Sequence, residues 1–254
     1  MASYEADVLQ AVALRGRVTV RELAALLGVS DQTVRRVVGP MAERGDVDKL
    51  HGAILARTRT GEPPFLARMA MDQDAKVAVA TVVAGIVADG DSIALDTGST
   101  TGFIAQALRQ HRNLTVVTNS TFVATILATI PGNRVHMAGT ELRNHDGAAF
   151  DDDAFRTVRS MRVRYAVLSA SAIDPKRGVM VHEHAEAEMW RAMAGIAERR
   201  IVAADHTKFG RSALVAIGTA QAGRAMQPGD IIATDVRPPR SCARVLRGLQ
   251  VVTP

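Results

Sequence analysis

From residue 92 to its end, the chain alternates short apolar runs with segments of helical periodicity, and this alternation restricts the fold more than any other feature. We expect strands at residues 92–96, 115–118, 134–138, 164–169, 201–204, 231–234 and 249–252. We expect helices at residues 103–109, 121–130, 185–198 and 242–247. Strands that alternate with helices form βαβ units, so the pattern predicts an open, mostly parallel α/β sheet covered by helices.

The first of these strands runs directly into "DTGSTT", residues 96–101. Ligands of open α/β sheets bind beyond the carboxyl ends of the strands. Gly98 permits a close turn there, and the amides and hydroxyls that follow open a helix in a way that suits a phosphate. A plain turn before an ordinary helix start is the other interpretation, since the stretch matches neither a Walker loop nor a GxGxxG fingerprint.

Two further strands end in polar residues. Asn119 and Ser120 follow the second strand, and Asp205 and Lys208 follow the fifth. Carboxyl ends of parallel strands meet at one edge of the sheet, so these side chains are expected at the same rim as residues 96–101. A lysine at this position could bind either a phosphate or a sugar hydroxyl. The alternative interpretation is a surface lysine that contacts only water.

The N-terminal part of the chain has the periodicity of a short helical bundle. Apolar residues recur at helical spacing in "VTVRELAALLGVSDQTVRRVV", and "YEADVLQAVALRG" predicts a helix before them. Gly28 ends one helix and Ser30 supplies the N-cap of the next, which gives a helix, a tight turn and a helix. Such a bundle is typical of helix-turn-helix DNA binders, although the same motif also occurs in purely packing roles.

The second helix of this motif carries side chains that suit the major groove. Its solvent face holds Gln32, Thr33, Arg35 and Arg36. Glutamine pairs with adenine, arginine with guanine, and threonine or arginine with phosphate. The following "DVDKLHGAILAR" predicts two short strands around His51, a wing that reaches backbone or minor groove.

Gly39-Pro40 lies within the predicted recognition helix. Proline removes the amide that would bond the carbonyl of Arg36 and crowds that carbonyl. We therefore expect the helix to kink or end there, with the base-reading residues before the break and the path to Met41 and the wing displaced.

Neither the helical nor the strand spacing of apolar residues continues through "GEPP", residues 61–64, so this segment marks a natural domain boundary. We expect a winged helix-turn-helix domain at residues 1–58, a linker and the start of a connecting helix at 59–74, and an α/β effector-sensing domain at 75–254.

Charge and composition narrow the class of protein. The net charge of +5 permits nucleic acid as a partner, and residues 1–60 hold nine Lys and Arg against seven Asp and Glu, so particular arginines matter more than a general basic field. A single cysteine excludes an internal disulfide. No apolar run reaches the roughly 20 residues that span a bilayer, so we expect a cytoplasmic protein without membrane contact.

A metal site is conceivable in "VHEHAEAE", residues 181–188, where His182 and His184 share a face if the stretch is extended. The spacing fixes no third ligand, and a polar loop that leads into a helix explains the acids equally well. We therefore expect no metal and no cofactor.

Together these motifs resemble the DeoR family of bacterial transcription regulators. The likeness joins "VS..TVRR" near the N-terminus to "GDSIALDTGSTT", "NLTVVTNS", "EAEMWRAM" and "VAADHTKFGRSA", in order and at matching spacing. The resemblance implies a sensor domain related in fold to ribose-5-phosphate isomerase. It also implies a repressor of a carbohydrate operon, a double-stranded DNA operator, a phosphorylated sugar-like effector, and a homodimer or homotetramer.

The resemblance, together with the pattern above, assigns two sets of residues. The DNA contacts are Arg21, Ser30, Gln32, Thr33, Arg35, Arg36 and His51. The effector contacts are Asp96, Gly98, Ser99, Thr100, Thr101, Asn119, Ser120, Arg143 and Lys208. Arg143 stands in "MAGTELRNHDGAAF", where Ala138-Gly139 replaces the Gly-Gly that the family commonly has, so this side of the pocket departs from the family pattern.

One other class of function remains open from the residues alone. A sugar-phosphate isomerase with an accessory DNA-binding module would use a carboxylate such as Asp96 or Asp205, beside Lys208, as its general base. The strand ends show no second clear acid/base pair, so we expect a regulator without catalytic residues.

Overall fold

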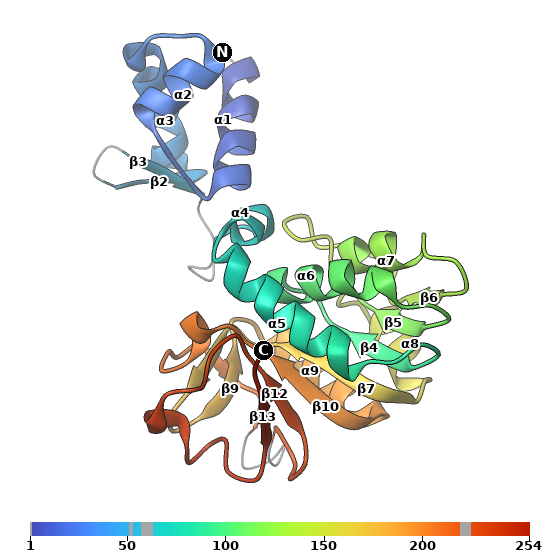
Figure 1. Cartoon of the computed structure of the whole chain (residues 1–254). Helices are drawn as coiled ribbons and strands as arrows, with labels where there is room; N and C mark the ends of the chain where they lie inside the picture. The colour runs from blue at the N-terminus through green and yellow to red at the C-terminus, as the bar shows by residue number, and fades with distance from the viewer. Residues whose placement is uncertain (1, 51–52, 57–62, 219–224) are drawn as a thin grey trace. The chain divides into compact units, whose positions relative to one another are not determined.

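The computed structural model describes residues 2–50, 53–56, 63–218 and 225–254 (Figure 1). The chain divides into two compact units, Met1–Met71 and Asp72–Pro254. No helix in these described ranges is long and apolar enough to cross a membrane.

The N-terminal unit is a winged helix-turn-helix, as predicted. Its helices are α1 (Ala2–Arg15), α2 (Val20–Leu27), α3 (Asp31–Arg44) and α4 (Phe65–Ala70). Its strands β1 (Arg17–Thr19), β2 (Val47–Leu50) and β3 (Ala53–Ala56) pair antiparallel in the order β1-β3-β2. The wing is the β2–β3 pair, and β1, which the sequence did not reveal, extends it to a third strand.

Local capping fixes the turn between α2 and α3. Thr19 and Glu22 form a capping box at the start of α2, and Gly28 ends that helix in the left-handed conformation at φ 65°. The Ser30 hydroxyl then accepts from the amide of Thr33 at 3.2 Å. Val34, Val38 and Met41 on one face of α3 are buried, so the opposite face points to solvent.

We expected α3 to kink or end at Gly39-Pro40. The helix does not end there, because it continues through Pro40 to Arg44. Pro40 and Arg36 are both exposed, so the carbonyl that loses its amide partner lies on the side of the helix that water reaches. Val37, Val38 and Met41 bury the same face on both sides of the proline and hold the two turns against one core.

The C-terminal unit is built on a seven-stranded sheet in the order β13-β12-β10-β7-β4-β5-β6. The strands are β4 (Ser92–Leu95), β5 (Thr115–Thr118), β6 (Arg134–Met137), β7 (Val163–Ser169), β10 (Ala197–Ala203), β12 (Ile231–Ala233) and β13 (Gln250–Val252). All of these neighbours pair in parallel, which confirms the predicted fold class.

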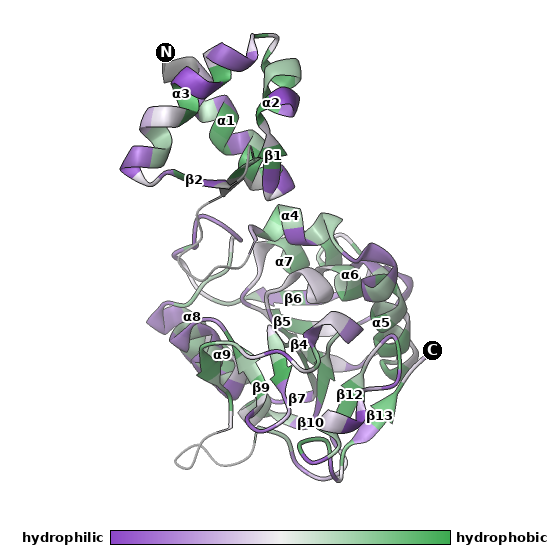
Figure 2. Cartoon of the chain, turned by 90° about the vertical axis from the view of Figure 1, so that its left-hand side faces the viewer, coloured by the Kyte–Doolittle hydropathy of each residue, from purple (hydrophilic) through white to green (hydrophobic). Residues whose placement is uncertain are grey.

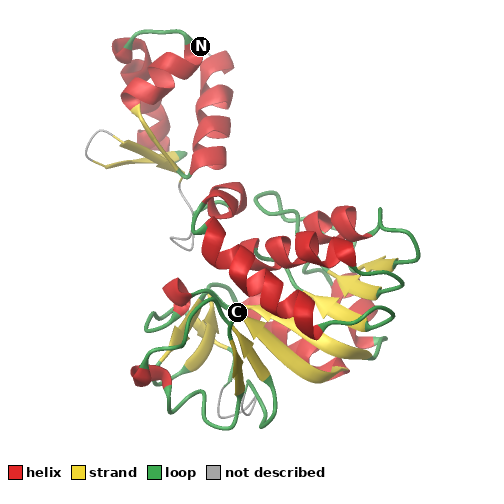
Figure 3. Cartoon of the chain, viewed as in Figure 1, coloured by secondary structure: helices red, strands yellow, loops and turns green. Residues whose placement is uncertain are grey.

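Helices cover both faces of this sheet (Figure 3). On one face lie α5 (Gln73–Ile86), α6 (Ser99–Ala107) and α7 (Thr121–Leu127), and on the other α8 (Asp152–Arg159) and α9 (His184–Ile196). Because strand side chains alternate, Ile93 and Leu95 pack under α5 and α6, whereas Ala94 faces the α8–α9 side. The strands at the centre of the unit are mostly hydrophobic in Figure 2.

The structure differs from the sequence-based prediction in several elements. A second, antiparallel sheet of β8 (Ala172–Asp174), β9 (Gly178–Val181) and β11 (Val215–Ala216) was not predicted, and neither was α8. The three strands run over only two to four residues, which is too short to show periodicity. The expected helix at 185–198 ends at Ile196, and β10 begins at once with Ala197.

The expected helix at 242–247 is wrong. A 3-10 turn, η3 (Arg240–Cys242), leads into successive turns with bonds such as Val245 N to Cys242 O. Pro239 precedes this segment and Gly248, at φ 84°, follows it. Between those two residues there is too little chain to propagate an α-helix.

Candidate functional site

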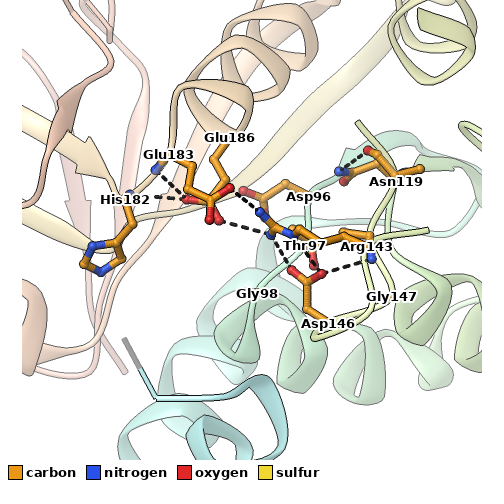
Figure 4. Close-up of polar contacts among 12 residues, drawn as sticks. Asp96, Thr97, Gly98, Asn119, Arg143, Asp146, Gly147, His182, Glu183 and Glu186 are labelled. Atoms are coloured by element: carbon orange, nitrogen blue, oxygen red, sulfur yellow. Dashed lines mark hydrogen bonds and ion pairs between the residues drawn. The ribbon is translucent and has the colours of Figure 1, made fainter. Parts of the chain in front are cut away.

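The candidate site lies at the carboxyl edge of the large sheet, where β4 and β5 end (Figure 4). Leu95 pairs with Thr118, so the next residues, Asp96 and Asn119, are neighbours across the two strands. Strand alternation turns both side chains toward the α8–α9 face. The sequence placed both residues at this rim, and the structure brings them together.

Asp96 is a buried carboxyl group with one satisfied and one unsatisfied oxygen. Its Oδ2 accepts hydrogen bonds from the amide of Ser169 at 2.9 Å and from the Ser169 hydroxyl at 3.1 Å. Its Oδ1 is buried and has no hydrogen-bond partner among the described residues. Burial, with a smaller contribution from the nearby Glu186 charge, raises the pKa of Asp96 to about 7, although the Ser169 bonds lower it.

Gly98 starts α6 without a side-chain cap, whereas Ser120 caps α7 and Asp151 caps α8. The first-turn amides of a helix have no intrahelical acceptor, so those of Ser99 to Thr101 are available to an anion. A Cβ at Gly98 would lie 2.8 Å from the Ser169 hydroxyl, so a side chain at this position would overlap Ser169 unless one of the two shifts.

Asn119 anchors the loop that follows β6. Its Nδ2 donates to the carbonyl of Ala149 at 3.1 Å. The other atom of the side-chain amide, Oδ1, is buried with no partner in the described part of the chain. The neighbouring Ser120 hydroxyl accepts from the amide of Val123 at 3.4 Å. The hydroxyl of Ser120 therefore has a structural use as the cap of α7.

Arg143 is held by three carboxylates. It binds Asp146 at 2.5 Å, Glu183 at 2.8 Å and Glu186 at 3.2 Å, and its guanidinium lies 4.4 Å from the ring centre of Phe150. These acids raise the pKa of Arg143 against the effect of its desolvation, and Arg143 lowers the pKa of Asp146. The sequence did not identify these carboxylates as its partners, because they arrive from a loop and from the start of α9.

The end of β10 contributes Asp205 and the short helix η2 (His206–Lys208), which places Lys208 at the same edge of the sheet. Asp205 is fully buried, and its Oδ1 accepts from the amide and hydroxyl of Thr207. Its Oδ2 has no partner among the described residues. His206 beside it pairs with Asp235 at 2.6 Å, and that bond raises the pKa of the histidine.

Two functional groups at this rim escaped the sequence reasoning. Ser169 ends β7 and binds Asp96, and the rule that strand ends line the site was sufficient to find it. Thr97 carries a buried hydroxyl without a partner in the described residues. His182 and His184 are not part of a metal cluster: no group of three metal-binding side chains occurs within the described ranges, and Glu183 and Glu186 form the capping box of α9.

The residues assigned to DNA lie largely on the outside of the N-terminal unit. Arg21, Gln32, Arg35 and Arg36 are exposed, and so is Ser30. Thr33 is half-buried, and its hydroxyl shares a 3.0 Å hydrogen bond with that of Ser30. His51 lies outside the described residues.

Two family models match the chain. Residues 5–60 match the DeoR-like helix-turn-helix domain, and residues 71–226 match the DeoR C terminal sensor domain. The second match alone spans more than half of the 254 residues.

Curated relatives match over most of the chain. The HTH-type transcriptional repressor CsqR of Escherichia coli (strain K12) is 34% identical over 84% of this chain and 81% of its own length. The glycerol-3-phosphate regulon repressor of the same organism is 30% identical over 94% and 92%. The putative aga operon transcriptional repressor of Escherichia coli O157:H7 is 32% identical over 82% and 78%.

Among solved structures, ribose 5-phosphate isomerase A of Methanocaldococcus jannaschii is similar at 15% identity and a TM-score of 0.39, over 54% of this chain and 55% of that chain. The three curated relatives are named as repressors, which confirms the regulator interpretation over the isomerase alternative. The chain, with a helix-turn-helix domain followed by a sensor domain, belongs to the DeoR family of bacterial transcription regulators.

Proposed function

We propose that this regulator represses a carbohydrate or related metabolic operon and that a phosphorylated sugar-like metabolite controls its affinity for the operator. One observation carries the sensing half of the proposal. Asp96, Thr97, Asn119 and Asp205, all at strand ends of one sheet edge, each keep a buried polar atom without a hydrogen-bond partner in the described part of the chain. Native proteins leave few such atoms unpaired, so a ligand is expected to complete them.

The uncapped start of α6 supports a phosphate as part of that ligand. The first-turn amides of Ser99, Thr100 and Thr101 carry the positive end of the helix dipole, and Gly98 removes any side chain that would block the approach. Lys208 at the same rim supplies a further positive charge. We assign Ser120 to the edge of this site, beside Asn119.

Operator recognition is assigned to α3. Gln32, Arg35 and Arg36 project from the face opposite the buried Val34 and Val38, as a helix that enters the major groove requires. We assign Arg21, which is exposed at the start of α2, to a phosphate contact. A homo-oligomer would bind two half-sites at once and multiply the contribution of each short helix.

The two functions are coupled through population shift. An effector that binds one arrangement of the oligomer more tightly moves the population toward that arrangement and changes operator affinity by the same coupling free energy. Such a regulator acts where the chromosome is, which places it in the cytoplasm.

The DNA half is tested by gel shift with a promoter fragment and the variants Arg35→Ala and Arg36→Ala. Each variant is expected to reduce operator affinity at least tenfold with the same thermal unfolding as the parent chain. Arg15→Ala, which removes an exposed arginine from α1, is the matched control and should bind as the parent does. Unchanged affinity in both α3 variants would overturn the assignment of base reading to α3.

The sensing half is tested by a thermal-shift screen against phosphorylated sugars and polyols, because a ligand raises stability by mass action. A compound that raises the unfolding temperature should also change operator affinity. Lys208→Ala should weaken that response. A response that survives both Lys208→Ala and Gly98→Val would show that the effector binds elsewhere.

A further inference from the structure

The side of the site that faces α9 is acidic. Asp146, Glu183 and Glu186 bind a single guanidinium, that of Arg143, and Asp96 lies close enough to Glu186 to feel its charge (Figure 4). Arg143 already binds three of these carboxylates at 2.5 to 3.2 Å. A second anion at this position would have to displace carboxylates from Arg143 and then lie beside them, which is unfavourable at short range in a poorly solvated site.

The unpartnered atoms on this side are acceptors. Asn119 Oδ1 can only accept a hydrogen bond. The same holds for Asp96 Oδ1 when the carboxyl group is ionised. Asp96 and Asn119 are 8% and 0% exposed, so bulk water does not satisfy them. A ligand group that completes them must donate, as a hydroxyl or an ammonium group does.

The opposite end of the site has the reverse polarity. The amides of Ser99 to Thr101 are donors at a helix N-terminus and attract negative charge. The two ends of one ligand therefore meet different chemistry, a donor cradle at α6 and an acceptor wall formed by Asp96, Asn119, Asp146, Glu183 and Glu186.

We propose that this acceptor wall makes the site selective for phosphorylated polyols, sugars or amino sugars whose distal end carries hydroxyl or ammonium donors, and that it rejects phosphorylated acids whose distal end is a carboxylate. The inference rests on the proposed phosphate-sensing function and adds the chemistry of the other end. Asp96 and Asn119 are then the specificity-determining residues, because a buried acceptor left opposite another acceptor costs more than a missing contact.

Two matched pairs of ligands test this selectivity on the full chain. Glycerol 3-phosphate has a hydroxymethyl group where 3-phosphoglycerate has a carboxylate. Glucose 6-phosphate has a hemiacetal at C1 where 6-phosphogluconate has a carboxylate. Calorimetric titration at pH 8, above the pKa of about 7 of Asp96, keeps that carboxyl group mostly ionised. In at least one pair the alcohol or sugar member should bind ten times more tightly than its acid, and in neither pair should the acid bind better.

Variants then locate the selectivity. Asp96→Asn should lower the ratio of the two affinities at least threefold, since it removes the charge and keeps an oxygen for Ser169. Glu183→Gln should lower it as well, and this second position covers the case in which Asp96→Asn fails to fold. Asp91→Asn is the matched control, because Asp91 is buried at the other end of the same strand region and should leave the ratio unchanged.

The outcomes separate the two proposals. Inorganic phosphate should bind weakly and compete with either member of a pair. If no phosphorylated compound and no inorganic phosphate binds, the proposed phosphate sensing is wrong, and this inference fails with it. If the compounds bind but the acids match or exceed their partners, or if both wall variants keep the parent ratio, the sensing function stands and the inference is overturned.

Discussion

The Asp96 carboxylate at the end of β4 accepts two hydrogen bonds from Ser169 at the end of β7, at 2.9 and 3.1 Å, while its other oxygen stays buried and unpartnered among the described residues. This pair joins two adjacent strands at the edge where the effector is proposed to bind. Burial raises the pKa of Asp96, and the two bonds from Ser169 oppose that rise.

The pKa of about 7 predicts how stability depends on pH. The folded pKa lies above the ordinary value of 3.8 for an aspartate, so between about pH 4 and 7 the native state binds more protons than the unfolded state. The contribution of Asp96 to stability is thus fully present below about pH 4 and is lost as pH rises through 7, at up to roughly 1.4 kcal/mol per pH unit. The free energy of unfolding of the parent and of Asp96→Asn, measured by denaturant from pH 5 to 8, should differ by this slope between pH 5 and about 7.

Ser169→Ala provides a control of opposite character. The Ser169 hydroxyl lowers the pKa of Asp96, so removing it should extend the pH-dependent window above pH 7. Parallel curves for the parent and Asp96→Asn would mean that Asp96 titrates near its ordinary value.

Gly98→Ala is expected to destabilise the C-terminal unit by about 1–3 kcal/mol because the new Cβ overlaps Ser169. The added atom would lie 2.8 Å from the Ser169 hydroxyl and 3.2 Å from its Cβ. Denaturant unfolding of a double-mutant cycle measures the overlap: Gly98→Ala should cost less in a Ser169→Ala background, with a coupling of about 0.5 kcal/mol or more. Strict additivity would place the strain elsewhere.

Ser30 caps α3 and is also a proposed DNA contact, and two substitutions separate these roles. Ser30→Ala removes the cap of α3 and should cost about 0.5–2 kcal/mol in thermal unfolding. Ser30→Asp keeps a capping oxygen and should retain stability, but it places a negative charge beside the DNA backbone and should weaken operator binding in gel shift. A Ser30→Asp variant that binds as well as the parent would limit Ser30 to the capping role.

Pro40→Ala should stabilise the N-terminal unit. The substitution restores the amide that bonds the carbonyl of Arg36 and removes the ring that crowds it, a change worth about 1–3 kcal/mol in a helix interior. Hydrogen exchange of the α3 amides reports this directly, with slower exchange expected around Met41. Equal or faster exchange would mean that the surrounding packing already compensates for the proline.

The sequence by itself determined most of the architecture. The period of the apolar residues separates a helical N-terminal bundle from an alternating α/β region, and the parallel sheet and winged helix-turn-helix followed from that period. The strand ends also predicted that Asp96, Asn119 and Lys208 lie at one edge, because carboxyl ends of parallel strands share one edge whatever the strand order. Local capping residues such as Gly28 and Ser30 fixed the turn before the recognition helix.

Only the tertiary structure decided what those residues meet. The strand order placed β7 beside β4 and so gave Asp96 its partner Ser169, a pairing across 73 positions that no local pattern encodes. Packing carried α3 through Pro40 against its local preference, since a shared buried face outweighs one lost hydrogen bond. The same long-range assembly enclosed Arg143 among three carboxylates, because charge pairing depends on separation in space and periodicity reports only on separation along the chain.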